Sequence, residues 1–233
     1  MTATDVRLWT VAEYRRMTET GILNPDERVE LIDGQIISMS AKNPPHAATN
    51  LCAADYLRNL VTGLALIRIQ DPIALSTNSE PEPDIAVVQI DSRCYQDFHP
   101  APANIFLLVE IADTTLETDR KRKALAYAKA GIADYWILDV NRWQVYVFRE
   151  PREGNYQLET VFNEDDVLSM LAFPEIEVQI SRLFPWIYGL VYWYQINYQN
   201  VVGAGDAQFP ISNSQMGASH FCKYTRRGEA LRQ

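Results

Sequence analysis

The sequence is poor in cysteine. It contains three in 233 residues, Cys52, Cys94 and Cys222, an odd number at wide spacing. Such a set forms neither a disulfide framework nor a zinc site. The absence of a disulfide pattern indicates a reducing compartment, so we expect a cytoplasmic protein.

Long apolar runs are also missing. No uninterrupted stretch reaches the roughly 20 residues that a membrane-spanning helix needs. Residues 1–5 lack the basic segment, followed by an apolar one, that begins a secretory signal. The hydrophobic fraction of 47% and the charged fraction of 22% are ordinary for a globular chain. We expect a folded domain that does not associate with a membrane.

Positive charge is in short supply. The chain has 21 Lys and Arg against 30 Asp and Glu, a net charge of −9. Proteins that bind a phosphate backbone usually carry a basic patch. The acidic total therefore argues against tight nucleic-acid binding, unless a local patch or a bound cation offsets the carboxylates.

The end of the chain differs from the rest. Residues 191–233 have no sustained periodicity and hold four basic and two acidic residues. We expect one domain over residues 1–190 and a poorly ordered C-terminal extension over 191–233, whose removal leaves folding unchanged. The alternative is a basic arm for an acidic partner.

The order of periodic segments predicts a mixed sheet. A strand, helix and strand between residues 105 and 140 have room for a right-handed parallel crossover, and the rest is rich in hairpins. Helices are expected after Thr10 and over residues 46–62 and 116–129, and strands at 29–32, 35–39, 65–70, 72–75, 85–88, 105–111, 133–140, 143–148, 156–162 and 176–180. The fold class is α/β, bordering on α+β, with helices flanking the sheet.

Two acids accompany the most apolar strands. Glu110 ends the run 105–109, and Asp84 directly precedes residues 85–88. Ionised carboxylates are almost never buried without a partner. One interpretation is a divalent-metal site, because hard cations take oxygen ligands. The other is that both acids face solvent at sheet edges.

A lysine follows on the next helix. Asp119, Lys123 and Tyr127 are spaced four residues apart and share one helix face, whereas Lys121 points away from it. The helix begins soon after Glu110, so Lys123 is within reach of the carboxylates. The alternative is that Lys123 merely pairs with Asp119 on a solvated face.

The segment around residues 110–139 strongly resembles the Uma2 family, which is grouped with restriction endonucleases of the PD-(D/E)XK type. The resemblance covers roughly residues 8–188. The family pattern is matched in order by Glu30-Leu31-Ile32-Asp33-Gly34, the histidine after Pro44-Pro45, Pro83-Asp84, Val109-Glu110-Ile111-Ala112, Asp119, Lys123, Tyr127 and Ala130-Gly131-Ile132-Ala133-Asp134-Tyr135-Trp136.

The resemblance implies a restriction-endonuclease-like fold and a set of roles. Asp84, Glu110 and the main-chain carbonyl of Ile111 would hold Mg²⁺ or Mn²⁺, with Glu30 as an auxiliary acid bound through water or a second ion. Ala112 stands where the superfamily name places a lysine, and Lys123 from the helix would replace it.

The implied function is that of a metal-dependent endonuclease that hydrolyses DNA phosphodiester bonds, with Glu30, Asp84, Glu110 and Lys123 as the catalytic set. A homodimer is expected, because cutting two strands takes two active sites. The alternative is a non-catalytic binding or assembly module that keeps the fold, since fold does not fix function. We interpret His46 as a residue of a helix start and Tyr127 as core.

Overall fold

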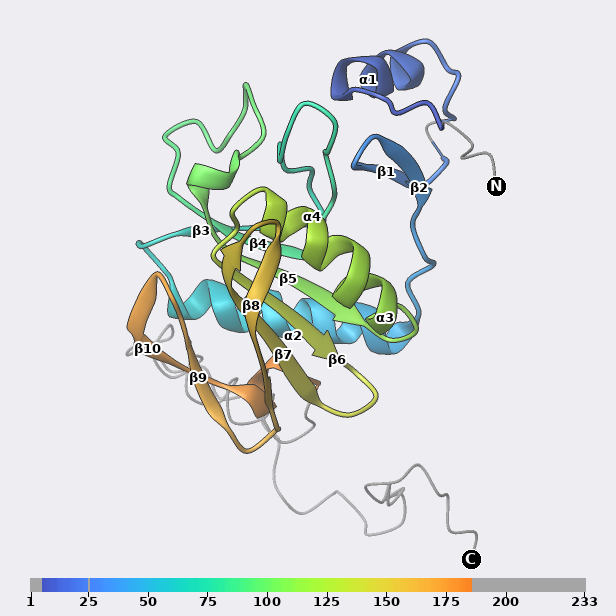
Figure 1. Ribbon diagram of the computed structural model, residues 1–233. Coiled ribbons are helices and arrows are strands. Elements are labelled where there is room, and N and C mark those ends of the chain that lie inside the picture. The colour runs from blue at the N-terminus through green and yellow to red at the C-terminus, as the bar shows by residue number, and fades with distance from the viewer. Residues whose placement is uncertain (1–5, 25, 186–233) are drawn as a thin grey trace, which may run out of the picture. The chain divides into compact units, whose positions relative to one another are not determined.

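The computed structural model describes residues 6–24 and 26–185, and the predicted extension over 191–233 lies outside them. The helical elements are α1 Val11–Glu19, α2 Pro44–Leu60, η1 Pro102–Asn104, α3 Leu116–Thr118, η2 Asp119–Lys123, α4 Ala124–Lys129 and η3 Ile180–Leu183. The strands are β1 Val29–Ile32, β2 Gln35–Ser38, β3 Leu66–Ile69, β4 Ile85–Val88, β5 Ile105–Ala112, β6 Asp134–Asp139, β7 Gln144–Arg152, β8 Asn155–Phe162, β9 Val167–Met170 and β10 Phe173–Gln179 (Figure 1).

A six-stranded sheet in the order β3-β4-β5-β6-β7-β8 forms the centre of the domain. Strands β5 and β6 run parallel, and the other neighbours in this sheet are antiparallel. The chain passes from β5 to β6 through the helical segment α3–η2–α4, which confirms the predicted crossover. Two separate hairpins, β1–β2 and β9–β10, complete the strands of the described residues.

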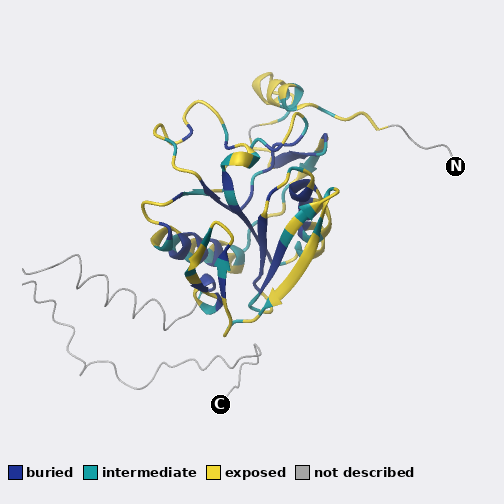
Figure 2. Ribbon diagram, turned by 60° about the vertical axis from the view of Figure 1, so that its left-hand side comes forward, coloured by how far each residue is buried: buried dark blue, intermediate teal, exposed yellow. Residues whose placement is uncertain are grey.

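Helices cover both faces of the sheet. On one face α2 packs with β9, β10 and η3, and on the other lies the η2–α4 helix (Figure 1). The central strands β4, β5 and β6 are buried at every residue except the half-buried Phe106, because both of their faces are covered, whereas β8 at the sheet edge is largely exposed (Figure 2). The near-continuous apolar run of β5 is therefore the sequence mark of a doubly covered strand.

Short sequence signals fix the elements that surround the sheet. Thr10 caps α1 with a capping box to Glu13, as its spacing predicts. Asp33 and Gly34 both take positive φ, 48° and 74°, and turn the chain from β1 into β2. A Cβ on Gly34 would lie 2.7 Å from the Leu8 side chain, so glycine is required there.

Three expectations about elements need correction. Residues 72–75 are not a strand, because Ile73 and Ala74 donate backbone hydrogen bonds to the loop carbonyls of Pro81 and Pro100. Helix α2 begins at Pro44, two residues before its predicted start, with Asn43 as its cap. Strand β9 was not predicted. None of the described helices combines the length and apolar character needed to cross a membrane.

Candidate active site

Asp84 and Glu110 are brought together by the register of two antiparallel strands. Ile85 of β4 lies opposite Val109 of β5. The strands are antiparallel, so Asp84, just before Ile85, and Glu110, just after Val109, come next in the ladder. The Ile111 N–H of β5 donates to Oδ2 of Asp84, at the start of the neighbouring strand, at 2.9 Å. Glu110 points to the same face of β5 as the buried Leu108 two residues before it, and Leu108 faces the η2–α4 helix. Both carboxylates thus lie beneath that helix.

Asp84 is held by three donors. Besides Ile111, Gln70 Nε2 donates to Oδ1 at 3.0 Å, and His46 Nε2 lies 3.1 Å from Oδ2. Burial by itself would raise the pKa of Asp84, but the hydrogen bond and charge of His46, with the Ile111 and Gln70 donors, bring it below its usual value. The arrangement favours the charged form of Asp84.

Glu110 is more deeply enclosed, with 3% of its surface exposed. Tyr127 donates its hydroxyl hydrogen to Oε1 at 2.7 Å, and Lys123 Nζ lies 3.0 Å from Oε2. Burial raises the pKa of Glu110 well above its usual range, the Lys123 charge opposes this, and the Asp84 charge adds to it. The site therefore favours an added positive charge.

A π-helical turn presents Lys123 to the carboxylates. The Ala124 N–H bonds to the Asp119 carbonyl, five residues back, so the helix widens over η2. Such turns are frequent at functional sites. Lys123 is buried and also lies 3.5 Å from Glu30 Oε1. Burial would lower the pKa of Lys123, but the Glu110 and Glu30 charges outweigh it and raise the pKa. The alternative of a solvated pair with Asp119 is wrong.

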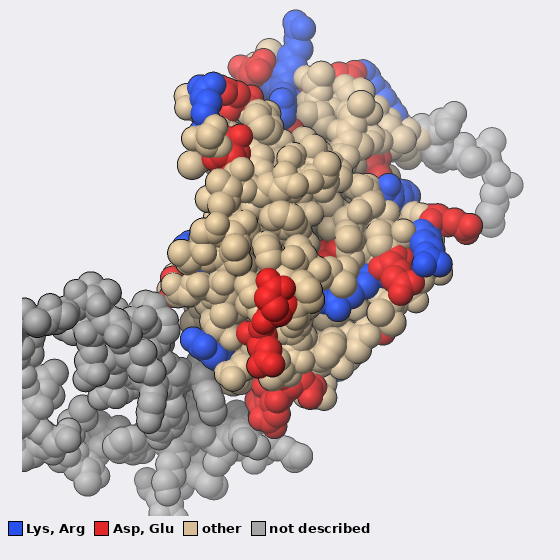
Figure 3. Space-filling view, turned by 90° about the vertical axis from the view of Figure 1, so that its left-hand side faces the viewer, with Lys and Arg blue, Asp and Glu red and all other residues tan. Residues whose placement is uncertain are grey.

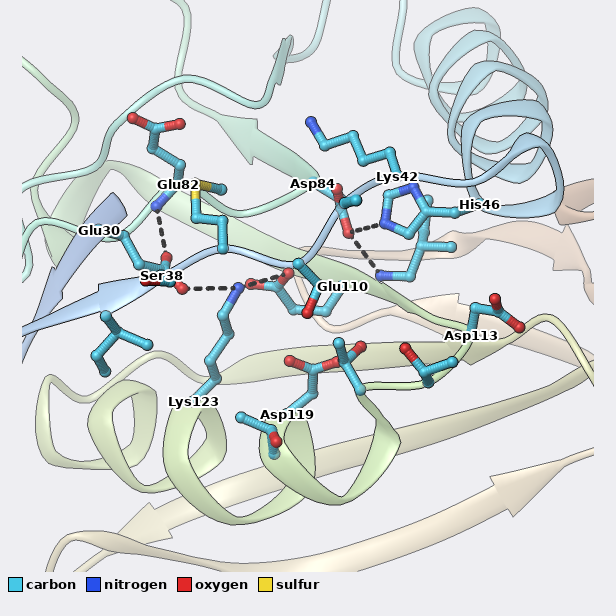
Figure 4. Close-up of a pocket in the computed structure, with 18 of the residues that line it drawn as sticks. Glu30, Ser38, Lys42, His46, Glu82, Asp84, Glu110, Asp113, Asp119 and Lys123 are labelled. Carbon is cyan, nitrogen blue, oxygen red and sulfur yellow. Dashed lines mark hydrogen bonds and ion pairs between the residues drawn. The ribbon is translucent and has the colours of Figure 1, made fainter. Parts of the chain in front are cut away.

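Glu30 enters the site from the separate β1–β2 hairpin. It is 4% exposed, and its Oε2 accepts a hydrogen bond from the Glu82 N–H at 3.2 Å. It is therefore not a surface acid of the hairpin. Figure 4 shows Glu30 and Glu110 on either side of the Lys123 ammonium.

Together these side chains line one cleft (Figure 4). The four residues predicted as catalytic, Glu30, Asp84, Glu110 and Lys123, all belong to its lining. Sequence reasoning missed Lys42 as a lining residue and gave His46 no contact with Asp84. The motif offered one signal for His46, its place directly after Pro44-Pro45, and none for Lys42.

The donor set was compared with what a divalent cation needs. No three His, Cys, Asp or Glu side chains of the described residues form a ready ligand cluster. Mg²⁺, however, is usually held by one or two carboxylates, waters and substrate phosphates. Asp84 and Glu110 supply two carboxylates in a cleft where acids outnumber bases, and this donor chemistry fits Mg²⁺ or Mn²⁺.

The main-chain carbonyl of Ile111 faces the same strand as its N–H. The N–H and C=O of one strand residue face the same neighbouring strand. The Ile111 N–H faces Asp84, whereas the Ala112 carbonyl accepts from the Val140 N–H on the β6 side. The Ile111 carbonyl therefore lies on the Asp84 side of β5, as a third ligand would require.

Comparison with known proteins identifies the family. The model of the Uma2 family, described as "putative restriction endonuclease", matches residues 11–181. The chain belongs to the Uma2 family. The match includes the four residues that meet in the cleft and ends before residues 191–233. No curated protein matches the chain.

A solved structure shares the fold. A crystal structure from Anabaena variabilis, titled as that of a "putative nuclease", aligns with a TM-score of 0.58 at 19% sequence identity. The alignment covers 75% of this chain and 97% of that one. This Uma2 protein therefore has the α/β arrangement of that structure, a mixed sheet flanked by helices.

Proposed function

We propose that the protein is a metal-dependent endonuclease that hydrolyses DNA phosphodiester bonds. The observation that carries the proposal is the meeting of Glu30, Asp84, Glu110 and Lys123 in one cleft from four separate parts of the chain. A structural ion pair needs no such set, and buried carboxylates with shifted pKa values in a cleft are typical of catalytic sites. Membership of the Uma2 family supports the same function.

Each residue then has a chemical task. Asp84, Glu110 and the Ile111 carbonyl would hold Mg²⁺ or Mn²⁺. When bound, such an ion acidifies an attacking water and offsets charge on the phosphate. The Lys123 ammonium offsets part of the same negative charge on the phosphate. Tyr127 fixes one oxygen of Glu110 and leaves the other facing Lys123, and Glu30 keeps Lys123 at the centre of the cleft.

The charge distribution limits how DNA is held. On the face drawn in Figure 3, Lys and Arg of the described residues are scattered singly and acidic side chains gather in a strip. That face has no basic band for a phosphate backbone. We propose that DNA is contacted by residues close to the cleft. The described residues of one protomer bring the four proposed catalytic side chains together once, so we propose that a homodimer cuts both strands.

A nicking assay tests the proposal. Purified protein should nick or cut supercoiled plasmid with Mg²⁺ or Mn²⁺ and stop when EDTA is added. Asp84→Ala and Glu110→Ala should abolish cutting while circular dichroism and melting show a folded protein. A matched control is Asp33→Ala, which removes an acid outside the cleft lining and should leave cutting unchanged. Cutting that survives both site substitutions would refute the proposal.

The net charge of −9 favours a second candidate, a non-catalytic module that keeps the fold. The same assay separates the two. A module of this kind would bind its partner with or without metal, and no divalent cation would produce nicks. Gel filtration of the same preparation tests the homodimer.

A further inference from the structure

Lys42 is a cationic side chain of the cleft that forms no ion pair within the part of the chain that the structure describes. It lies on the connection between β2 and α2 and lines the cleft on the Asp84 side, whereas Lys123 lies on the Glu110 side (Figure 4). Lys123 is paired with two carboxylates. Lys42 forms no hydrogen bond and no ion pair with any described residue.

The surroundings of Lys42 make the lack of an ion pair unusual. The residue is only partly exposed, and burial and the charge of Arg28 lower the pKa of its ammonium, against the opposing charges of Asp84, Glu82 and Glu110. Arg28 is placed beside it because the Arg28 carbonyl accepts a hydrogen bond from the Met39 N–H, just before Lys42 in the chain. Arg28 likewise has no ion pair among the described residues. Lys42, on the cleft lining, therefore has a second positive charge close by, although Arg28 itself is not part of the lining.

A solvated lysine is the simpler explanation, but it fits less well. Exposed lysines of the neighbouring helix behave differently, as Lys121 pairs with Glu117 at 2.8 Å. Holding two cations side by side costs free energy that an anionic ligand between them would recover. Asp84 and Glu110 belong to the proposed metal site, and Glu82, the remaining acid whose charge acts on Lys42, also acts on Arg28. One carboxylate balances only one of these two cations, so the other is free for an anion that comes from outside the chain.

We propose that Lys42, with Arg28 beside it, binds a DNA phosphate next to the one being cut and so positions the substrate. This inference rests on the proposed function and assigns a task that Lys123 cannot perform, because the charge of Lys123 is already matched by Glu110 and Glu30. Lys42 acts in binding and transfers no proton. Its loss should raise KM and leave kcat close to that of the wild type.

Binding of a fluorescent duplex oligonucleotide, followed by anisotropy in EDTA over a range of salt, tests the proposal without catalysis. Lys42→Met should weaken binding about tenfold, the loss expected for one charge-assisted contact. The slope of log K against log salt should become shallower by about one. Lys42→Arg should restore both. Lys121→Met removes the same charge from the exposed helix and should leave the slope unchanged.

The outcomes separate this inference from the proposed function. Wild type that binds and cuts DNA, with Lys42→Met showing the same affinity and slope, would overturn the role of Lys42 alone. Binding that depends on Lys42 without any metal-dependent cutting would support Lys42 and overturn the nuclease. Wild type that binds no DNA in EDTA but cuts it with Mg²⁺ would overturn the role of Lys42 and leave the nuclease standing. Melting curves check that Lys42→Met is folded, which we expect because Lys42 makes no bond to lose.

Discussion

Tyr127 donates its hydroxyl hydrogen to Glu110 Oε1 at 2.7 Å, from a side chain with no exposed surface. The sequence places Tyr127 in the core, and that prediction is confirmed. The structure adds that the same residue reaches from the apolar cluster into the cleft. A core residue thus sets the orientation of a proposed metal ligand.

Replacing Tyr127 by Phe should separate these two tasks. The buried Oε1 of Glu110 loses its donor, and an unsatisfied buried acceptor costs about 1–3 kcal/mol. Nicking should fall without being abolished, because the carboxylate remains but is less firmly oriented. Thermal melting and plasmid nicking measure the two effects.

Tyr156→Phe is the matched control for this change. Its hydroxyl donates to the Ile132 carbonyl at 2.8 Å, and Tyr156 is not part of the cleft lining. It should lower the melting temperature to a similar extent and leave nicking intact. Equal losses of activity in the two variants would show that Tyr127 acts through stability alone.

Much of the fold can be read from the sequence because each signal is local. The cap at Thr10 and the turn at Asp33-Gly34 depend on residues within a few positions, and both are found where predicted. The strand at residues 72–75 was wrong because its backbone groups bond to distant loop carbonyls. The π turn in η2 carries no known sequence mark.

The candidate site likewise divides into residues that local sequence signals predict and residues that only contacts between distant parts of the chain bring in. Asp84 and Glu110 were predicted together because an acid beside an apolar strand is conspicuous. The spacing on the next helix placed Lys123 within their reach, and the resemblance to Uma2 supplied the role of Glu30. The role of His46 was underestimated, since its contact with Asp84 joins residues 38 positions apart. Lys42 has no periodicity or motif around it, and only the path of the β2–α2 connection brings it to the cleft.

Metal binding should stabilise the protein measurably. A ligand that binds the folded state adds about 2.7 kcal/mol at a concentration 100 times its Kd. For a domain of this size that raises the melting temperature by about 5–10 °C. We expect Mn²⁺ to shift the wild type in this way and to leave Asp84→Asn unshifted. Asp33→Asn, outside the cleft lining, should respond like the wild type. Equal shifts in all three would place the bound metal elsewhere.

Lys123 and Glu110 should be energetically coupled. Removing one partner of a buried ion pair leaves an unpaired charge and costs about 3–5 kcal/mol, so Lys123→Met should be strongly destabilising. Glu110→Gln in the same chain removes the charge left behind and should recover part of the loss. Urea unfolding of the two single variants and the double variant measures the coupling. Strictly additive losses would mean that the two side chains do not form a pair in solution.

His99 should give the protein a pH-dependent stability that is independent of the cleft. Its Nδ1 is buried without a hydrogen-bond partner among the described residues. Burial lowers the pKa of His99 below its usual 6.5, and the Arg15 and Arg68 charges lower it further, against the opposing charge of Glu80. The folded protein therefore favours the neutral ring.

The sign of the effect follows from this depressed pKa. Between the folded pKa and 6.5 the unfolded chain binds more protons at His99 than the folded chain does, so stability is lost as the pH falls through this window. Urea unfolding from pH 8 to pH 5 should show the free energy of the wild type falling relative to that of His99→Gln. Other titrating groups are common to both proteins and cancel in the difference. A difference that stays constant, or that grows in favour of the wild type on acidification, would contradict a buried neutral His99.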